Sequence, residues 1–143
     1  MKLSNIKLAN LLTYSGTLPL VASVFLLFSP VAGFDGILIA KAYGAIIISF
    51  LCGIHWATYL FFAEKCPRNL LVTSNAVALL AWSSLLFTNQ VSALILQSLC
   101  FVYLFMLDRK LHEAGLLSEW FYVLRRNATV IVVVCLLIIA VFS

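Results

Sequence analysis

Polar side chains inside long apolar stretches are the residues of this sequence that could do chemistry. His55 is the leading candidate, because an ionisable group is costly to bury in hydrocarbon and is therefore a functional candidate by default. Asn75 lies as far from the intervening turn as His55 does, so a helical hairpin would place both side chains at one depth. The candidate intramembrane polar site consists of His55, Asn75, Tyr14, Thr17 and Tyr103.

Two interpretations of this polar set remain open. In the first, His55, Asn75 and Tyr14 form an interhelical hydrogen-bond network, and such bonds contribute on average about 0.6 kcal/mol each in membranes. In the second, the set lines a cavity on the cytoplasmic side that binds a lipid headgroup, a quinone or a proton. The first interpretation is favoured, because the sequence predicts neither a carboxylate nor a lysine deep in any span.

The other reactive residues do not form a recognisable catalytic set. His55 and His112 are the two histidines, and they cannot share a depth, which argues against haem ligation by two histidines. Cys52 and His55 are spaced i, i+3, but two ligands do not make a closed metal site. We find no nucleophile with a base and an acid, no phosphate-binding glycine loop and no inverted repeat. The sequence therefore predicts no cofactor, no metal site and no catalytic residue, and it favours a protein that is not an enzyme.

The composition is that of a polytopic membrane protein. The chain has 143 residues, of which 64% are hydrophobic and 10% are charged, and its mean hydropathy is +1.14. Soluble domains are about half apolar and about a quarter charged, so a soluble domain is excluded, as is a disordered chain. Three of the four cysteines fall in apolar stretches, so the cysteines do not form a disulfide framework.

Five apolar stretches predict a single all-α domain over residues 1–143, a bundle of five transmembrane helices. The stretches cover residues 11–28, 37–63, 70–87, 91–107 and 128–142. They are long and do not alternate in polarity, which favours helices over transmembrane strands. Pro19 is expected to kink the first span and to free a carbonyl near Ser15. A cleaved signal peptide is the alternative for this span, although its apolar stretch is longer than a usual signal core.

Small residues predict how the second span packs. Ala45, Ser49, Gly53 and Ala57 are four residues apart and form one stripe on a helix. Small side chains let two helix backbones approach closely in lipid. We expect an intramolecular helix contact along this stripe, with a homodimer seam as the alternative.

The segment 108–127 is predicted as a cytoplasmic loop that contains a short interfacial helix before the last span. Its apolar residues recur at helical spacing on one face: Leu117, Trp120, Phe121 and Leu124. Trp120, Arg125 and Arg126 would anchor this helix at the level of the headgroups. Lipid is the simpler partner for this surface, and a protein partner is the alternative.

Basic residues predict the orientation of the chain. Eight of them fall on one side of the predicted bundle: Lys2, Lys7, Lys65, Arg68, Arg109, Lys110, Arg125 and Arg126. Lys41 alone falls on the other side, where it is expected to snorkel to the headgroups. The positive-inside rule then places the N-terminus in the cytoplasm and the C-terminus outside. Basic residues spread over the turns do not form a phosphate-binding patch, so no nucleic acid is expected as a partner.

The segment Ala42–Trp56, with the sequence AYGAIIISFLCGIHW, resembles the signature of the bacterial membrane family known as domain of unknown function 3429. That family looks related to the mitochondrial transmembrane protein 69. Other pieces that match are Gly16-Thr17-Leu18-Pro19, Asp108, Trp120-Phe121 and Leu124-Arg125. Cys52 stands where the pattern has glycine, and the third span lacks an expected proline. The resemblance implies a five-helix protein of the bacterial inner membrane and implies no activity.

Two functional hypotheses follow. The leading hypothesis is a non-enzymatic accessory or assembly component of a membrane complex, embedded in the lipid bilayer beside a membrane-protein partner or a second copy. The alternative is a small ligand-binding or transport protein for a quinone, a lipid or a proton, which would use a polar cavity around His55.

Overall fold

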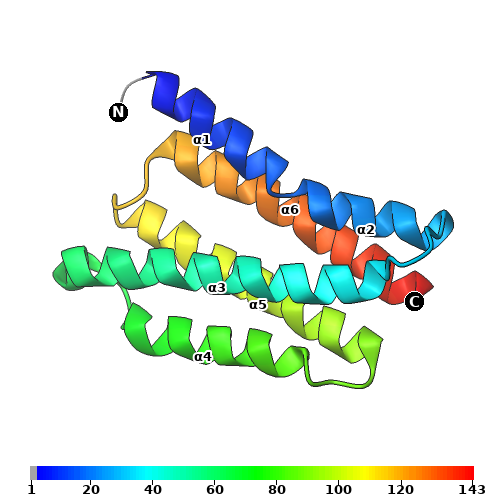
Figure 1. Cartoon of the computed structure of the whole chain (residues 1–143). Helices are drawn as coiled ribbons and strands as arrows, with labels where there is room; N and C mark the ends of the chain where they lie inside the picture. Colours follow the sequence, from blue (N-terminus) through cyan, green and yellow to red (C-terminus); the bar gives the residue numbers. More distant parts are fainter. Residues whose placement is uncertain (1–2) are drawn as a thin grey trace.

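The computed structural model describes residues 3–143 as a bundle of antiparallel helical rods (Figure 1). The elements in chain order are α1 Leu3–Ser15, α2 Leu18–Phe28, α3 Gly36–Phe62, the 3-10 turn η1 Ala63–Lys65, α4 Leu70–Ser84, α5 Gln90–Glu113 and α6 Glu119–Phe142. Because α1 and α2 follow one another along a single rod, the bundle has five rods. The described residues contain no strand, and the prediction of an all-α bundle is confirmed.

Within residues 3–143, four rods are long and apolar enough to cross a membrane: Leu3–Phe28, Gly36–Lys65, Gln90–Glu113 and Glu119–Phe142. The remaining rod, α4, has 15 residues and is therefore roughly 22 Å long. This is less than the hydrocarbon thickness of about 30 Å. The predicted span 70–87 thus ends early as a regular helix, and residues 85–87 continue it only as hydrogen-bonded turns. These lengths are consistent with a multi-pass membrane protein.

The first rod is broken where proline predicts a kink. Pro19 lacks a backbone N–H, and the helix is interrupted between α1 and α2 at Gly16 and Thr17. The hydroxyl of Tyr43 on α3 donates to the freed carbonyl of Gly16 at 2.8 Å. The predicted kink is confirmed, and a side chain from α3 satisfies the carbonyl that it exposes.

Only the first residue of the predicted small-residue stripe on α3 faces the interior of the bundle. Ala45 is buried, but Ser49, Gly53 and Ala57 are exposed, and a Cβ built at Gly53 would meet no atom within 4 Å. Each step of four residues turns a helix by about 40° beyond a full circle, so a stripe with this spacing drifts around the rod. The predicted intramolecular contact along the stripe is therefore wrong. The buried face of α3 instead carries small residues in its first half, among them Ala40 and Gly44, and larger ones such as Ile48 further along.

A polar cluster joins α3, α4 and α5 at the end of the bundle where α4 ends. The buried Gln97 side chain donates to the carbonyl of Lys41 at 2.9 Å and to the hydroxyl of Ser84 at 2.8 Å. The amine of Lys41 is itself buried and donates to the carbonyl of Phe87 at 3.1 Å. Lys41 was expected to snorkel to the headgroups, and this expectation is wrong. Its amine instead binds the carbonyl of Phe87, which lies just after α4. Gly44 leaves the space that the Gln97 amide occupies.

Figure 1 shows that the N-terminal end of α1, the α3–α4 turn and the α5–α6 turn lie at one end of the bundle. The C-terminus lies at the other end. Antiparallel packing thus gathers the predicted basic turns on one side. The membrane orientation deduced from these charges stays a prediction.

We predict that Gly44→Ala destabilises the bundle, because a Cβ at this position collides with the Oε1 atom of Gln97. The free energy of unfolding in mixed micelles should fall by about 1–3 kcal/mol, as for other overpacked sites. The matched control is Gly53→Ala on the same helix, where the space is open and alanine is the better helix former. Equal effects of the two substitutions would contradict the predicted role of Gly44.

Candidate functional site

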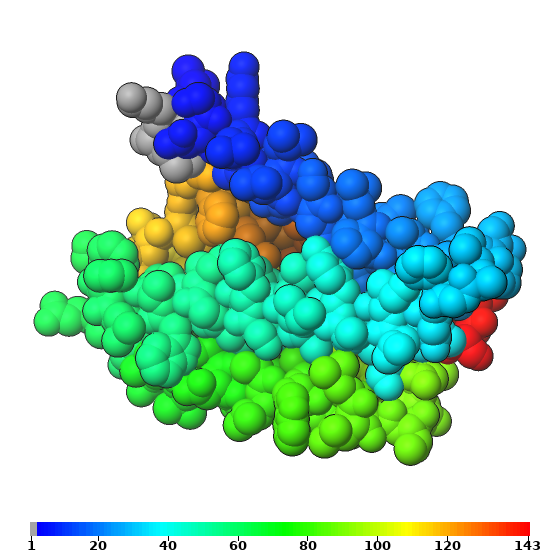
Figure 2. All heavy atoms as spheres, in the orientation of Figure 1, coloured from blue at the N-terminus to red at the C-terminus, as the bar shows by residue number. Residues whose placement is uncertain are grey.

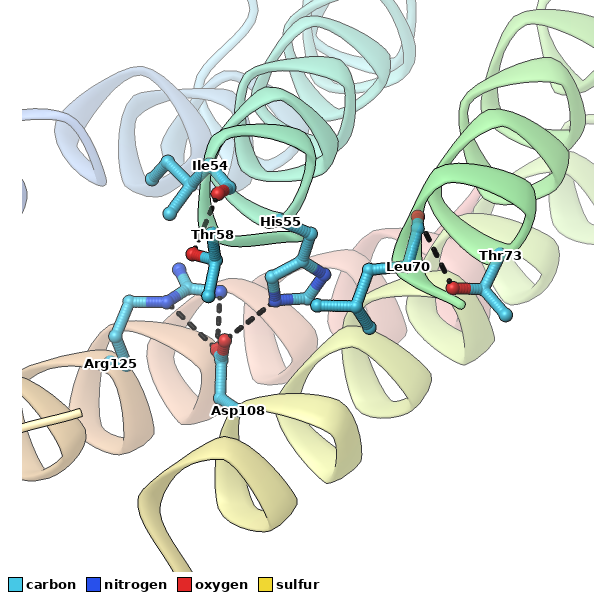
Figure 3. A network of polar contacts seen from close by, with 7 residues as sticks. All are labelled: Ile54, His55, Thr58, Leu70, Thr73, Asp108 and Arg125. Carbon is cyan, nitrogen blue, oxygen red and sulfur yellow. Dashed lines mark hydrogen bonds and ion pairs between the residues drawn. The ribbon is translucent and has the colours of Figure 1, made fainter. Parts of the chain in front are cut away.

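Three ionisable side chains from three helices meet in the interior, as Figure 3 shows. Asp108 of α5 accepts a hydrogen bond from Nε2 of His55 on α3, with 2.8 Å between Nε2 and Oδ1. Its other oxygen, Oδ2, lies 2.9 Å from Nε and 2.8 Å from Nη2 of Arg125 on α6. His55 is 1% exposed, Asp108 2% and Arg125 8%. We name these three residues the buried triad.

Two members of the buried triad, Asp108 and Arg125, lie in parts of α5 and α6 that were predicted to be loop, whereas His55 lies inside the predicted second span. The predicted loop 108–127 is helical except for residues 114–118, because α5 continues to Glu113 and α6 begins at Glu119. Its amphipathic part is helical as expected, but it forms the first turns of α6 and not a separate interfacial helix. A prediction from hydropathy ends a span at its first charged residue. Two opposite charges that neutralise each other can nevertheless lie inside a bundle, so the helices extend further than hydropathy indicates.

Arg125 is therefore not an interfacial anchor, because its side chain is buried against Asp108. Arg126, the next residue, is exposed, and Trp120 is half-buried with its ring edge against Phe121. Asp108 and Arg125 carry opposite charges and lie at similar distances along the sequence from the short turn 114–118. This pattern was the signal in the sequence that could have identified the pair.

The turn between α5 and α6 sets the relative positions of Asp108 and Arg125. Gly115 has a φ of +74°, the left-handed conformation that ends a helix at low cost. The two ring nitrogens of His112 face the carbonyl of Leu117 at 2.9 Å and the carboxylate of Glu119 at 3.0 Å. The same ring stacks on Tyr122 with centroids 4.6 Å apart. The short turn thus fixes the register in which the two charged side chains meet.

Both oxygens of Asp108 have hydrogen-bond donors, whereas one ring nitrogen of His55 has no partner among the described residues. Each oxygen of Asp108 receives at least one hydrogen bond, so the anion is stabilised on both sides. Nε2 of His55 serves as the donor in this arrangement, an assignment that follows from the hydrogen-bond network. The second ring nitrogen, Nδ1, is buried, has no hydrogen-bond partner within residues 3–143, and points away from Asp108 (Figure 3).

Only His55 of the five predicted polar residues belongs to the buried triad. Asn75 is exposed on the outer side of α4, and Tyr14 is exposed with its hydroxyl 3.4 Å from the Asn127 amide. Thr17 is buried, but its hydroxyl donates to the carbonyl of Tyr14 at 2.8 Å. Tyr103 is half-buried beside an apolar cluster. The predicted network is wrong, because an equal depth along two helices does not fix the direction in which their side chains point.

A cavity of about 270 Å³ lies beside the buried triad, between α1, α3 and α6. We name it the α1–α3–α6 cavity. Its lining residues are Ala9, Leu12, Thr13, Gly16, Thr17, Ile47, Phe50, Leu51, Ile54, Phe101, Phe121, Arg125, Ala128, Thr129 and Val132. Figure 2 shows this region as a hollow in which α6 (orange) lies recessed between α1 (blue) and α3. Helix α1 has no buried residue, so the wall on that side is only loosely packed.

Two polar side chains of α6 meet this cavity one turn apart. Arg125 binds Asp108 through Nε and Nη2, and its third guanidinium nitrogen makes no hydrogen bond to any residue that the structure describes. Thr129 is 6% exposed, and its hydroxyl has no partner in residues 3–143. Residues four apart lie on one helix face. The site thus combines an apolar cavity with hydrogen-bond donors at one wall, the usual composition of a pocket for a small molecule.

The His, Cys, Asp and Glu side chains of the described residues are not clustered as metal ligands. No group of three His, Cys, Asp or Glu side chains within residues 3–143 is placed to hold a metal ion. The four cysteines are free thiols. What the buried triad and the cavity offer is hydrogen bonding in an apolar setting.

We predict that Asp108→Ala lowers the free energy of unfolding by about 3–5 kcal/mol, because it leaves the Arg125 charge buried without a partner. The control is Glu113→Gln, which removes an exposed i, i+4 pair with Arg109 and should cost less than about 1 kcal/mol. Replacing all three residues together by apolar side chains of similar volume should restore much of the loss. Similar losses for Asp108→Ala and Glu113→Gln in micelle unfolding would contradict the assignment.

Comparison with known proteins identifies a family and no characterised relative. Residues 6–141 match the family model described as "Protein of unknown function (DUF3429)". No curated protein and no solved structure matches the chain. Because the family match covers nearly the whole sequence, the resemblance noted for Ala42–Trp56 is confirmed, and the chain belongs to the DUF3429 family.

Proposed function

We propose that this protein binds an amphiphilic molecule in the α1–α3–α6 cavity. The observation that carries the proposal is the Thr129 hydroxyl, which is buried at the cavity wall and has no partner among the described residues. Leaving such a group unpaired costs about 1–3 kcal/mol. A bound headgroup would supply the missing partner.

The buried serine hydroxyls in the described helices bond back to the backbone, whereas the Thr129 hydroxyl does not. Thr58 donates to the carbonyl of Ile54 at 2.9 Å, and Ser98 donates to the carbonyl of Leu94 at 2.9 Å. Threonine and serine side chains in helices commonly bond back to the carbonyl one turn earlier in this way. The Thr129 hydroxyl makes no such bond within residues 3–143 and is left without a partner on a residue that lines the cavity.

The dimensions and the lining of the cavity favour a lipid-like ligand. Its volume of about 270 Å³ is near the lower end of the range for small-molecule pockets. Most of the lining side chains are apolar, and Arg125 is the one charged residue among those that the structure describes there. The apolar part of an amphiphile would occupy the lining from Ile47 to Ile54, with its polar end at Arg125 and Thr129. The ligand would enter the α1–α3–α6 cavity from the bilayer by passing α1, which is loosely packed.

The proposal places the site in the cytoplasmic half of the bacterial inner membrane, with the N-terminus in the cytoplasm. The support is the gathering of the basic turns at the end of the bundle that is nearer to the buried triad. Arg125 lies six residues after the start of α6, or roughly 9 Å along the helix. This is a depth at which a headgroup of a bilayer molecule can reach it.

We predict that Ala128→Phe abolishes ligand retention, because the ring fills the α1–α3–α6 cavity. Native mass spectrometry of the detergent-purified protein should find a lipid-like ligand on the wild type and none on this variant. Thr129→Val, which keeps the shape and removes the hydroxyl, should weaken retention about fivefold.

The matched control is Val130→Phe, which adds the same ring on the exposed face of α6 and should retain the ligand. A wild type that carries no ligand and takes up no added amphiphile would refute the proposed function. Equal retention by Ala128→Phe and Val130→Phe would place the ligand elsewhere.

A second candidate function, an accessory component of a membrane complex, is favoured by the outward direction of Ser49, Gly53 and Ala57. A small-residue face on a lipid-facing helix allows the close approach of a partner helix. We predict that Gly53→Leu leaves the monomer folded, because its side chain enters open space, but dissociates a complex that forms there.

Size measurement after extraction in a gentle detergent tests this second function. Ala76→Leu, on the exposed side of α4, is the control and should leave the complex intact. A lone wild-type monomer, or a complex that Gly53→Leu does not change, would count against the accessory function.

A further inference from the structure

We propose that the α1–α3–α6 cavity selects a neutral headgroup with a hydrogen-bond-accepting carbonyl, and that Asp108 is the residue that determines this specificity. The inference rests on the proposed function and adds the chemical class of the ligand. It excludes carboxylate and phosphate headgroups in their charged forms.

The first step concerns hydrogen-bond direction. A guanidinium has donors only, so any ligand group that meets the free nitrogen of Arg125 must be an acceptor. The Thr129 hydroxyl, one turn further along α6, can donate to the same group. A headgroup held by both residues therefore carries an acceptor oxygen.

The second step concerns charge. Asp108 already neutralises Arg125, with its Oδ2 atom 2.8 Å from Nη2. The other titratable group in contact with Asp108 is His55, whose Nε2 atom lies 2.8 Å from Oδ1. An anionic ligand would add an uncompensated charge in an apolar, water-poor site, which is strongly unfavourable. A carbonyl accepts the same hydrogen bonds without that penalty.

The third step concerns the geometry that keeps one guanidinium nitrogen free. His55 holds the Oδ1 atom of Asp108, and both Nε and Nη2 of Arg125 bind the single atom Oδ2. Arg125 therefore does not form a fork across the two carboxylate oxygens, and its remaining nitrogen has no partner in residues 3–143. His55 is thus a positioning residue, which acts on the ligand through Asp108 and Arg125.

Two sources supply this chemistry in a bilayer. One is the ester carbonyl of an uncharged lipid, and the other is the ring carbonyl of a quinone. Both combine an apolar tail with a neutral acceptor. A methyl ester of a straight-chain acid and a benzoquinone with an alkyl chain are suitable probes for the two sources.

The experiment measures the binding of matched straight-chain probes to the full chain in uncharged micelles. At mildly alkaline pH, a long-chain methyl ketone should bind about tenfold more tightly than the carboxylate of equal chain length. As the pH falls through the pKa of the fatty acid, its neutral form accumulates, so its apparent affinity should rise while that of the ketone stays constant. Tighter binding of the ester or of the quinone identifies the source.

The decisive variant is Asp108→Asn, which removes the compensating charge and keeps the shape. It should reverse the preference, so that the charged carboxylate binds about tenfold more tightly than the ketone. Glu113→Gln, an exposed change on the same helix, should leave the preference unchanged. Should Asp108→Asn not fold, as judged by circular dichroism, the pH series on the wild type still decides whether the cavity selects a neutral headgroup.

Three results would count against these proposals in distinguishable ways. A carboxylate that binds the wild type as tightly as the ketone at alkaline pH overturns this inference and leaves the proposed function intact. A folded Asp108→Asn variant with an unchanged preference does the same. Failure of every probe to bind overturns the proposed function itself, and this inference with it.

Discussion

The neutralisation of Arg125 by Asp108 is the interaction on which the rest of this structure depends. A single charge of either sign would be costly at this depth, because the apolar interior of the bundle solvates it poorly. As a pair they allow α5 and α6 to continue as helices through residues that would otherwise end each span. His55 completes the arrangement by occupying the second carboxylate oxygen, and this links α3 to the other two helices.

A second polar cluster at the other end of the bundle acts in a similar way with different chemistry. Gln97 joins α5 to α3 and α4, and Lys41 binds the free carbonyl of Phe87 after the short helix α4. Between the two clusters the contacts are apolar. In a lipid environment, where hydrophobic burial does not hold helices together, polar contacts at both ends define the register of the helices.

The cavity results from an imperfection in this packing. Pro19 breaks the first rod, and α1 then lies against α6 without burying any of its own residues. The space left between α1, α3 and α6 is lined by Arg125 and Thr129, and among the described residues the Thr129 hydroxyl has no hydrogen-bond partner. The same charge pair that stabilises the bundle thus sets the chemistry of its cavity.

The sequence by itself determined the all-α membrane bundle, the break near Pro19, the gathering of basic turns at one end and the family. These follow from hydropathy, backbone chemistry and a contiguous motif, all of which are local properties of the chain. Only the tertiary structure decided that His55 meets Asp108 and Arg125 and not Asn75 or Tyr14, and that Ser49 and Gly53 face outward. The physical reason is that depth can be counted along a helix, whereas the direction of a side chain depends on how each helix is rotated against its neighbours.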